Sequence, residues 1–309
     1  CTFLSPDTSE PIASFLNFEP PAVNVAEHYD IPLAAVHVSP VRPNGRYLPF
    51  LPPALGRYAL TVFEWANWRG VKKFEDEQRR QLGLPKATVR APRRITERGS
   101  LEVQAYDEVC FPGLAEEWAK WNGQRPFVGA LTMELPTDTD DEVAAWIAAG
   151  TPPIFFGFGS TPVKSPTDTL AMISAACAEL SERALVCSGW SDFSDLPRSD
   201  HVKVVSTMNY AAAFPACRAL VHHGGMGTTS AGLRAGVPML IFWTAPDQAI
   251  WASLIKRLKV GSGRHISTAT QKSLVKSLRR ILQPEYVSRA REIATQMTEP
   301  AESVANSAR

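Results

Sequence analysis

One segment combines the end of a buried strand, a glycine-rich turn and the start of a helix: Val221-His222-His223-Gly224-Gly225-Met226-Gly227-Thr228-Thr229. Its glycines permit a tight turn because they lack a Cβ atom. The helix predicted over residues 228–235 ends at Gly236 and Pro238, which are typical stop residues. A helix that begins with glycines and hydroxyls presents free N–H groups and the positive end of its dipole. The segment therefore predicts a phosphate-binding site.

The two histidines at the strand end are expected to have different roles. Adjacent strand residues point to opposite faces of a sheet, so only one of His222 and His223 can face a phosphate. The other is expected to be a structural histidine.

The second half of the chain alternates predicted strands and helices, which is typical of a doubly wound parallel α/β sheet. Strands are predicted over residues 154–158, 184–187, 202–205, 219–222 and 239–243. Helices are predicted over residues 168–180, 209–214, 247–258, 271–282 and 286–297. Ligands of such sheets bind at the carboxyl ends of the strands. The polar residues predicted at that edge are Gly159-Ser160, Ser188-Gly189, His223, Gly227-Thr228 and Asp247-Gln248.

The first half contains a predicted α/β unit with a helix over residues 23–29 and a strand over residues 33–37. His37 ends that strand, and it is either a ligand-site residue or an ordinary, partly buried histidine. A long helix predicted over residues 55–82 carries a stripe of Trp and Phe side chains, which we interpret as core. Some of these side chains could instead line a pocket for an apolar acceptor.

A proline-containing segment of little periodicity separates the two halves of the chain. We therefore predict an N-terminal domain over residues 1–127, a linker over residues 128–139 and a second domain over residues 140–309.

Composition excludes several classes of protein. The net charge of the 309-residue chain is +1, which gives no electrostatic footprint for nucleic acid. Five cysteines without metal-type pairing indicate reduced thiols of a cytoplasmic protein. No apolar run approaches the roughly 18 residues of a membrane span, so any membrane contact is expected to be peripheral, at the inner face of the membrane.

The sequence resembles a known family at the segment HHGGMGTTSAGLRAGVP, residues 222–238, and at the later pair Asp247-Gln248. Together they are similar to the donor-site signature of inverting nucleotide-sugar glycosyltransferases with the GT-B fold, and most of all to actinobacterial glycopeptide and glycopeptidolipid glycosyltransferases. The resemblance runs from about Asn24 to the C-terminus and includes FPGLAEEW (111–118) and FGFGS (156–160). It implies two Rossmann-like doubly wound domains facing across a cleft, with an N-terminal domain that is incomplete here.

The resemblance implies a role for each donor-site residue. The residues that would contact the diphosphate are Ser160, His223, Gly225, Gly227 and Thr228. Asp247 and Gln248 would hold sugar hydroxyls, although Asp247 is also placed as the N-cap of its helix, and Gly159-Ser160 also fits an ordinary strand-end turn.

The nucleobase would lie against Met208 and Tyr210. A Trp and a Glu that bind the base and the ribose in plant relatives are replaced here by Thr207 and Ala231. This agrees with bacterial members and leaves UDP and dTDP both open.

Asp138-x-Asp140 is a divalent-metal motif in a different glycosyltransferase fold. Here the acids precede a helical pattern that starts at Val143, where they suit cap and first-turn positions. We therefore predict no metal site, and the resemblance implies no cofactor.

The activity that the resemblance implies is a metal-independent, inverting transfer of a hexose or 6-deoxyhexose from a UDP- or dTDP-sugar to a hydroxyl of a lipopeptide, glycolipid or other hydrophobic acceptor. Family members begin with a strand and a Gly-x-x-Gly-Asp turn that supplies the general base. This chain shows no such turn and is shorter than the family's usual length, so the base is expected in missing N-terminal residues, with His37 and Asp7 as guesses. The alternatives are an inactive nucleotide-sugar-binding protein and a nucleotide-sugar epimerase.

Overall fold

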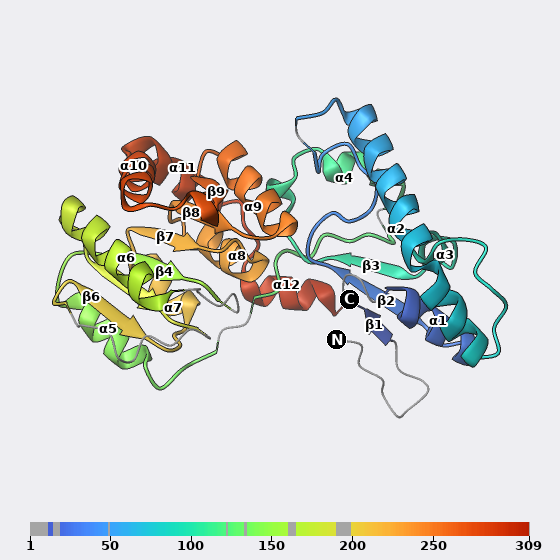
Figure 1. Ribbon diagram of the computed structural model, residues 1–309. Coiled ribbons are helices and arrows are strands. Elements are labelled where there is room, and N and C mark those ends of the chain that lie inside the picture. The colour runs from blue at the N-terminus through green and yellow to red at the C-terminus, as the bar shows by residue number, and fades with distance from the viewer. Residues whose placement is uncertain are drawn as a thin grey trace. The chain divides into compact units, whose positions relative to one another are not determined.

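A computed structural model describes residues 12–14, 19–48, 50–121, 123–132, 135–159, 165–189 and 199–308. The chain divides into two compact units (Figure 1). Unit 1 comprises Cys1–Leu131 and Thr298–Arg309, and unit 2 comprises Thr132–Met297. The boundary at residue 131 lies inside the predicted linker.

The C-terminal residues differ from the predicted division, which assigned everything up to residue 309 to the second domain. The chain returns to unit 1, where it ends in α12 (Pro300–Ser307). The backbone N–H of Thr298 donates to Oδ1 of Asp107 (2.6 Å). Gly129 packs so closely on this segment that a Cβ atom there would lie 2.5 Å from Oγ of Ser303. These contacts within unit 1 explain the return.

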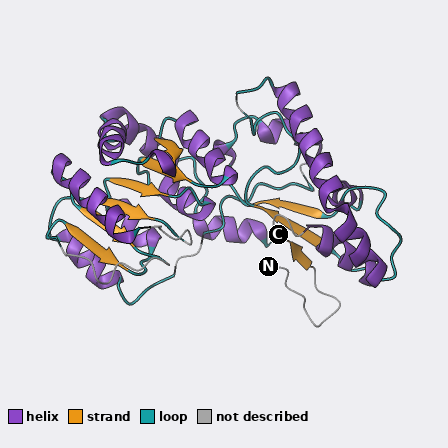
Figure 2. Ribbon diagram, viewed as in Figure 1, coloured by secondary structure: helices purple, strands orange, loops and turns teal. Residues whose placement is uncertain are grey.

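Unit 2 is built on a six-stranded sheet in which every neighbouring pair is parallel, in the order β6-β5-β4-β7-β8-β9 (Figures 1 and 2). Its strands are β4 (Ile154–Gly157), β5 (Ala184–Cys187), β6 (Val202–Val205), β7 (Ala219–His222), β8 (Met239–Trp243) and β9 (Gly261–His265). Its helical segments are α5 (Asp140–Ala148), α6 (Pro166–Leu180), α7 (Tyr210–Ala213), η3 (Phe214–Ala216), α8 (Met226–Arg234), α9 (Pro246–Arg257), η4 (Ile266–Thr268), α10 (Gln271–Ile281) and α11 (Pro284–Ala294). The strand order reverses between β4 and β7, and ligands bind at such a reversal in open α/β sheets.

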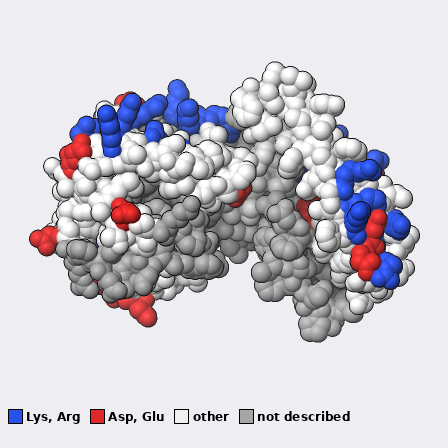
Figure 3. Space-filling view, viewed as in Figure 1, with Lys and Arg blue, Asp and Glu red and all other residues white. Residues whose placement is uncertain are grey.

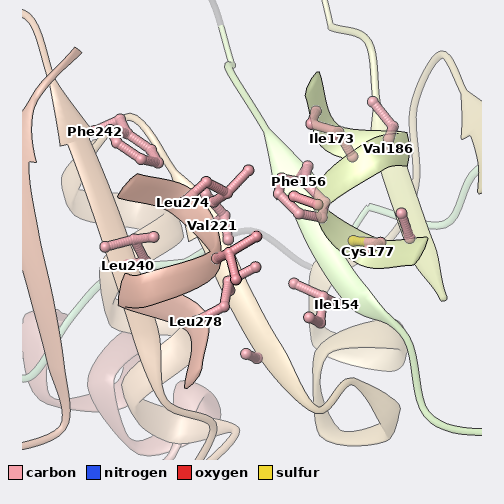
Figure 4. Packing of buried hydrophobic residues seen from close by; sticks show 14 of the residues in the cluster. Ile154, Phe156, Ile173, Cys177, Val186, Val221, Leu240, Phe242, Leu274 and Leu278 are labelled. Carbon is pink, nitrogen blue, oxygen red and sulfur yellow. The ribbon is translucent and has the colours of Figure 1, made fainter. Parts of the chain in front are cut away.

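The core of unit 2 lies between this sheet and two helices, α6 and α10 (Figure 4). Strand side chains such as Phe156 and Val221 meet Ile173 of α6 and Leu278 of α10. Every residue of β4, β5 and β7 is buried. Strands covered on both faces need continuous apolar runs, and these runs made the strands recognisable in the sequence.

Unit 1 has a smaller parallel sheet, in the order β1-β2-β3. Its strands are β1 (Ile12–Ser14), β2 (Leu33–His37) and β3 (Leu101–Gln104). Its helical segments other than α12 are α1 (Glu19–Tyr29), α2 (Pro53–Gln81), α3 (Ala91–Glu97), η1 (Glu108–Cys110), α4 (Leu114–Glu117) and η2 (Ala119–Trp121). Small apolar clusters between β2, α1 and α3 include Val23, Leu33 and Ile95.

The interpretation of the α2 aromatic stripe as core is wrong. Phe63 is 69% exposed and Trp65 is 49% exposed. The helix is instead held through its polar face, where Nε1 of Trp68 donates to Glu75 (2.9 Å) and Nη1 of Arg79 donates to Asn24 (2.8 Å). Because the polar side chains take the inner face, the large apolar side chains of the first half of α2 point to solvent.

No helix in the described ranges is both long and apolar enough to cross a membrane.

Candidate functional site

Three loops meet at the carboxyl edge of the unit 2 sheet. Gly159 follows β4, Gly189 follows β5 and His223 follows β7. A Cβ atom on Gly159 would lie 2.5 Å from Cε1 of His223, and one on Gly225 would lie 2.6 Å from Nε2 of the same ring. A Cβ atom on Gly189 would collide with the carbonyl oxygen of Gly159. Gly159 and Gly225 therefore allow the backbone to close around the His223 ring, and Gly189 allows the loop after β5 to pack on Gly159.

The two adjacent histidines have different environments. His222 is buried, and its Nδ1 accepts a hydrogen bond of 3.1 Å from the N–H of Gly224. Burial, with a smaller effect of the neighbouring His223, lowers the pKa of His222 to about 3. His222 therefore stays neutral in the folded protein and has the structural role that strand alternation predicted for one of the pair.

His223 is half-buried at the junction of the loops. Burial lowers its pKa, while a backbone hydrogen bond with Gly157 and the nearby carboxylate of Asp247 act in the opposite direction. The net shift is downward, so the ring is neutral near pH 7. A neutral imidazole has one N–H donor, so the ring can offer it to a phosphate oxygen only in place of the Gly157 backbone.

The start of α8 lies beside this ring. Gly225 is the N-cap, and no side chain in the described part of the chain caps the first turn. The N–H and the Oγ1 of Thr229 both bond the carbonyl oxygen of Gly225 (2.9 and 2.8 Å). The N–H groups of Met226, Gly227 and Thr228 have no partner within the helix, because the first turn of a helix has none. Gly227 is exposed, and a Cβ atom there would meet nothing within 4 Å.

The predicted diphosphate residues His223, Gly225, Gly227 and Thr228 thus lie in one turn, next to uncapped N–H groups. Ser160, the fifth of them, lies outside the described residues.

The pair Asp247-Gln248 lies in the first turn of α9, which packs against the turn after β7. A Cβ atom on Gly224 would lie 3.2 Å from Cβ of Gln248. The N-cap is Ala245 and not Asp247, because the helix begins at Pro246 and Asp247 is its second residue. Oε1 of Gln248 accepts from the N–H groups of Thr244 (2.8 Å) and Ala245 (3.2 Å). Gln248 therefore does the capping, and the Asp247 side chain is exposed.

The segment predicted to hold the nucleobase belongs to an aromatic cluster. The ring of Tyr210 stacks on Phe214, with 4.6 Å between centroids, and meets Phe155 edge-on at 5.4 Å. Burial raises the pKa of Tyr210, and Met208 is buried. This packing leaves Thr207 as an exposed part of the segment.

Asp140 of the Asp138-x-Asp140 motif is the first residue of α5, and Asp138 precedes the N-cap Thr139. Oδ2 of Asp140 accepts from the N–H of Thr137 (2.8 Å), and Oδ1 accepts from Oγ1 of Thr137 (2.6 Å) and the N–H of Asn209 (2.8 Å). These bonds lower the pKa of Asp140 and tie the helix start to the segment before α7. Within the described ranges, no cluster of three or more His, Cys, Asp or Glu side chains is placed to hold a metal ion.

His37 lies at the carboxyl end of β2 in unit 1, and it is buried. Its Nε2 bonds Oε1 of Glu19 (2.9 Å), and its Nδ1 bonds Nε2 of Gln104 (3.2 Å). Burial lowers the pKa of His37, although the hydrogen bond with Glu19 acts in the opposite direction. With both nitrogens bonded to protein groups, His37 fits a structural role better than that of a general base. Asp7 lies outside the described residues.

Sequence reasoning missed one residue at the edge of the unit 2 sheet. His265 ends β9 beside Trp243, the last residue of β8, and the two rings meet edge-on at 4.7 Å. No strand was predicted over residues 261–265, because Gly-Ser-Gly-Arg-His lacks apolar alternation. Its place in the chain could have revealed it, because a crossover helix such as α9 usually leads to another parallel strand.

Comparisons with known proteins agree with this geometry. Residues 184–307 match the family of erythromycin biosynthesis protein CIII-like proteins, C-terminal domain. An uncharacterized glycosyltransferase of Mycobacterium tuberculosis (strain ATCC 25618 / H37Rv) is 63% identical over 283 residues, which cover 91% of this chain and 68% of the relative.

Solved structures show the same fold. The glycotransferase of kitacinnamycin matches with a TM-score of 0.68 at 17% identity, over 94% of this chain and 72% of that structure. The glycosyltransferase VinC, solved in complex with dTDP, matches with a TM-score of 0.59 at 19% identity, over 92% of this chain and 67% of that structure. The chain therefore belongs to the glycosyltransferase family, and its fold is the GT-B fold of that family's nucleotide-sugar enzymes.

Proposed function

We propose that this glycosyltransferase binds a UDP- or dTDP-sugar at the carboxyl edge of the unit 2 sheet. It transfers a hexose or 6-deoxyhexose from that donor, with inversion and without a metal ion. The acceptor is a hydroxyl of a lipopeptide, a glycolipid or another hydrophobic molecule.

The observation that carries this proposal is the position of His223 next to the uncapped start of α8. The departing diphosphate gains negative charge as its bond to the donor sugar breaks. Free N–H groups at a helix start and an imidazole N–H are suited to hold that charge, and here they belong to one short turn. The exposed carboxylate of Asp247 acts on the same side, where it accepts hydrogen bonds from sugar hydroxyls.

The acceptor class is supported by the outer face of α2. Leu55, Tyr58, Val62, Phe63 and Trp65 are exposed there, although side chains of this size are usually buried. An apolar acceptor would cover such a face. We assign no general base among the described residues, because both ring nitrogens of His37 are bonded within unit 1.

The location of the enzyme is proposed to be the cytoplasm. Cys110, Cys177, Cys187 and Cys217 are buried and free of disulfides, which suits a reducing compartment.

The test of the donor site is titration calorimetry with UDP and dTDP. His223→Ala should weaken binding of the preferred nucleotide by about 1.5–3 kcal/mol, as expected for a hydrogen bond to a charged group. His28→Ala, which removes an exposed histidine of unit 1, is the matched control and should bind as the wild type does. Equal affinity of wild type and His223→Ala would contradict the assignment.

Two further measurements separate the alternatives. Donor binding and turnover should not change with EDTA; activity that is lost with EDTA and restored by Mg²⁺ or Mn²⁺ would bring the Asp138-x-Asp140 motif back as a metal site. Nucleotide binding without sugar transfer would identify a nucleotide-sugar-binding protein. Conversion of the sugar without release of free nucleoside diphosphate would identify an epimerase.

A further inference from the structure

The positive charges of the chain are concentrated in one segment. Residues 256–291 contain ten Lys and Arg and a single acidic residue, Glu285, which gives a formal net charge of +9, whereas the whole chain carries +1. The segment covers the end of α9, the strand β9, all of α10 and most of α11. Figure 3 shows Lys and Arg side chains in a row along the side of unit 2 that carries these helices.

Helix α10 has the most one-sided arrangement. Its exposed residues include Lys272, Lys276, Arg279 and Arg280, at positions that return to one face of a helix. Its apolar residues, such as Leu278, are buried in the core against α6. The helix contains no acidic residue. Its outer face therefore carries basic side chains and no acidic side chain of its own.

This arrangement works against the stability of the helix itself. Lys272 lies in the first turn, where the positive end of the helix dipole disfavours a cation. Lys272 and Lys276, and likewise Lys276 and Arg280, are like charges four residues apart, which is also unfavourable. Arg279 pairs with Glu179 (3.2 Å), but neither Lys272 nor Lys276 has an ion-pair partner among the described residues. Helix formation therefore does not explain these two lysines.

The positive face continues onto the neighbouring helices. Nε of Arg280 donates to the hydroxyl of Tyr286 at the start of α11 (2.8 Å). Nε of Arg289, further along α11, donates to the carbonyl oxygen of Leu258 at the end of α9 (3.1 Å). Lys256 and Lys259 flank that end and are exposed. Arg289 also pairs with Glu292 (2.5 Å). We call the surface formed by Lys256, Lys259, Lys272, Lys276, Arg279 and Arg280 the basic face.

We propose that the basic face docks this enzyme on an anionic lipid bilayer, at the level of the headgroups. The inference rests on the proposed function in one respect, because a lipid-like acceptor would be presented at such a surface. The apolar side of α10 is occupied by the protein core and is not available to enter the hydrocarbon. Binding is therefore electrostatic, and each basic residue near an anionic membrane contributes about fivefold to the partition coefficient.

A bilayer fits the basic face better than a single-stranded nucleic acid does. Proteins that bind single strands place aromatic side chains where bases can stack. The exposed large apolar side chains of the described residues all lie outside residues 256–291. Phosphate-bearing headgroups need no such platform, and long flexible lysines reach them from a helix that lies along the surface.

The test is sedimentation of the protein with vesicles, either of phosphatidylcholine alone or of an equal mixture of phosphatidylglycerol and phosphatidylcholine. The wild type should bind the mixed vesicles at low salt, should bind phosphatidylcholine weakly, and should be released as salt shortens the Debye length. The double variant Lys272→Gln/Lys276→Gln should bind the mixed vesicles about 25-fold more weakly.

The matched control is Lys73→Gln/Lys86→Gln, which removes the same charge from two exposed lysines of unit 1 and should bind as the wild type does. Equal losses in both variants would overturn the proposal, because net charge and not the basic face would then be responsible. Binding that survives high salt, or tighter binding to an oligonucleotide than to vesicles, would also overturn it.

Calorimetry with UDP and dTDP separates this inference from the proposed function. Lys272→Gln/Lys276→Gln should bind nucleotide with wild-type affinity, since neither lysine belongs to the donor site. Loss of vesicle binding with unchanged nucleotide binding supports the basic face. Absence of nucleotide binding in the wild type would refute the donor site. The vesicle experiment would then still decide whether the basic face binds an anionic bilayer.

Discussion

The two units contain parallel sheets that are stabilised in different ways. In unit 2 the strands β4, β5 and β7 are wholly buried, and apolar side chains fill the layer between the sheet and the helices α6 and α10. In unit 1 the centre of β3 holds Glu102, which is fully buried and pairs with Arg42 and Arg125. Unit 2 has its apolar side chains inside, whereas unit 1 buries charges beside its apolar clusters and leaves a row of apolar side chains of α2 outside.

The difference shows what each kind of interior can contribute. Burial of apolar surface stabilises a fold by about 25 cal/mol per Å², without any requirement on direction. A buried ion pair contributes little by itself, because both charges lose their hydration, but it becomes very costly to break. In unit 1, Arg42 also bonds Glu19 (2.9 Å) and joins it to the Glu102 pair. We expect this network to specify one arrangement of α1, β2 and β3.

The largest expected effect is that of acid on unit 2, through His222. Its pKa is lowered to about 3 from an ordinary value of 6.5, so its contribution to stability is complete above pH 6.5 and is lost as the pH falls toward 3. The loss amounts to at most about 5 kcal/mol. His222→Asn keeps an oxygen acceptor for the Gly224 N–H and should flatten this dependence. Urea titrations at several pH values, read by hydrogen-exchange mass spectrometry of peptides from each unit, would show it; an unchanged pH profile in the variant would contradict it.

The second effect is the loss of a buried pair in unit 1. Glu102→Ala leaves Arg42 and Arg125 without their shared carboxylate and should lower the free energy of unfolding of unit 1 by about 3–5 kcal/mol. Glu97→Ala is the control, since it removes an exposed partner of Arg93 and should cost less than about 1 kcal/mol. Urea titrations followed by hydrogen exchange of peptides from unit 1 measure both variants. If the two cost the same, the buried network would not be what distinguishes unit 1.

Acid should weaken this network as well. Burial acts to raise the pKa of Glu19, but the charge of Arg42 and the hydrogen bond from His37 outweigh it and lower the pKa to about 2 from 4.5. Its contribution is therefore complete above pH 4.5 and is lost as the pH falls toward 2. Glu19→Gln should remove that part of the acid sensitivity of unit 1 and leave unit 2 unchanged.

A pair of glycines compares backbone strain in the two units. Gly224 of unit 2 has φ of +93° and a Cβ atom there would lie 2.7 Å from Cγ2 of Ile241, whereas Gly83 of unit 1 has φ of +70° and open space around it. Gly83→Ala should cost about 1 kcal/mol through its backbone alone. Gly224→Ala should cost about 2–4 kcal/mol, because overpacking adds to the strain. Thermal unfolding of both variants checks the difference, and equal costs would mean that the turn after β7 can shift.

The smallest effect is expected on the outer face of α2. Phe63→Gln should change the free energy of unfolding by no more than about 0.5 kcal/mol, because the side chain is 69% exposed. Phe74→Gln, at 80% exposed, should behave in the same way. Urea unfolding measures both. A loss well above about 1 kcal/mol in Phe63→Gln would show that another part of the protein covers this face.

The sequence predicted most of unit 2 because the central strands β4, β5, β7 and β8 are largely apolar runs. The predicted strands over residues 184–187, 202–205, 219–222 and 239–243 are confirmed residue for residue. The strand β9 was missed, because Gly261 to His265 carries no apolar pattern and takes its conformation from pairing with β8. In unit 1, the predicted strand over residues 33–37 is likewise confirmed residue for residue. The predicted burial of the aromatic side chains of α2 is wrong.

The phosphate site was predicted from the local chemistry of one segment, and the roles of the single donor-site residues were implied by the family resemblance. A glycine-rich turn between a strand and a helix has few conformations, so the placement of His223 beside the start of α8 was foreseeable from residues 221–229. The capping role of Gln248 was not, since it depends on the exact residue at which α9 begins.

Sequence by itself determined the fold class, the family and the local geometry of the turn that we propose to bind phosphate, because each depends on periodicity or on neighbouring residues. Only the tertiary structure decided that His222 is the buried member of the histidine pair, that the charges of Glu19, Arg42 and Glu102 meet inside unit 1, and that the C-terminal helix returns there. It also decided that the large apolar side chains of α2 face outward. The physical reason is that burial and pairing depend on residues far apart in the chain, and no local pattern encodes which partner a side chain will meet.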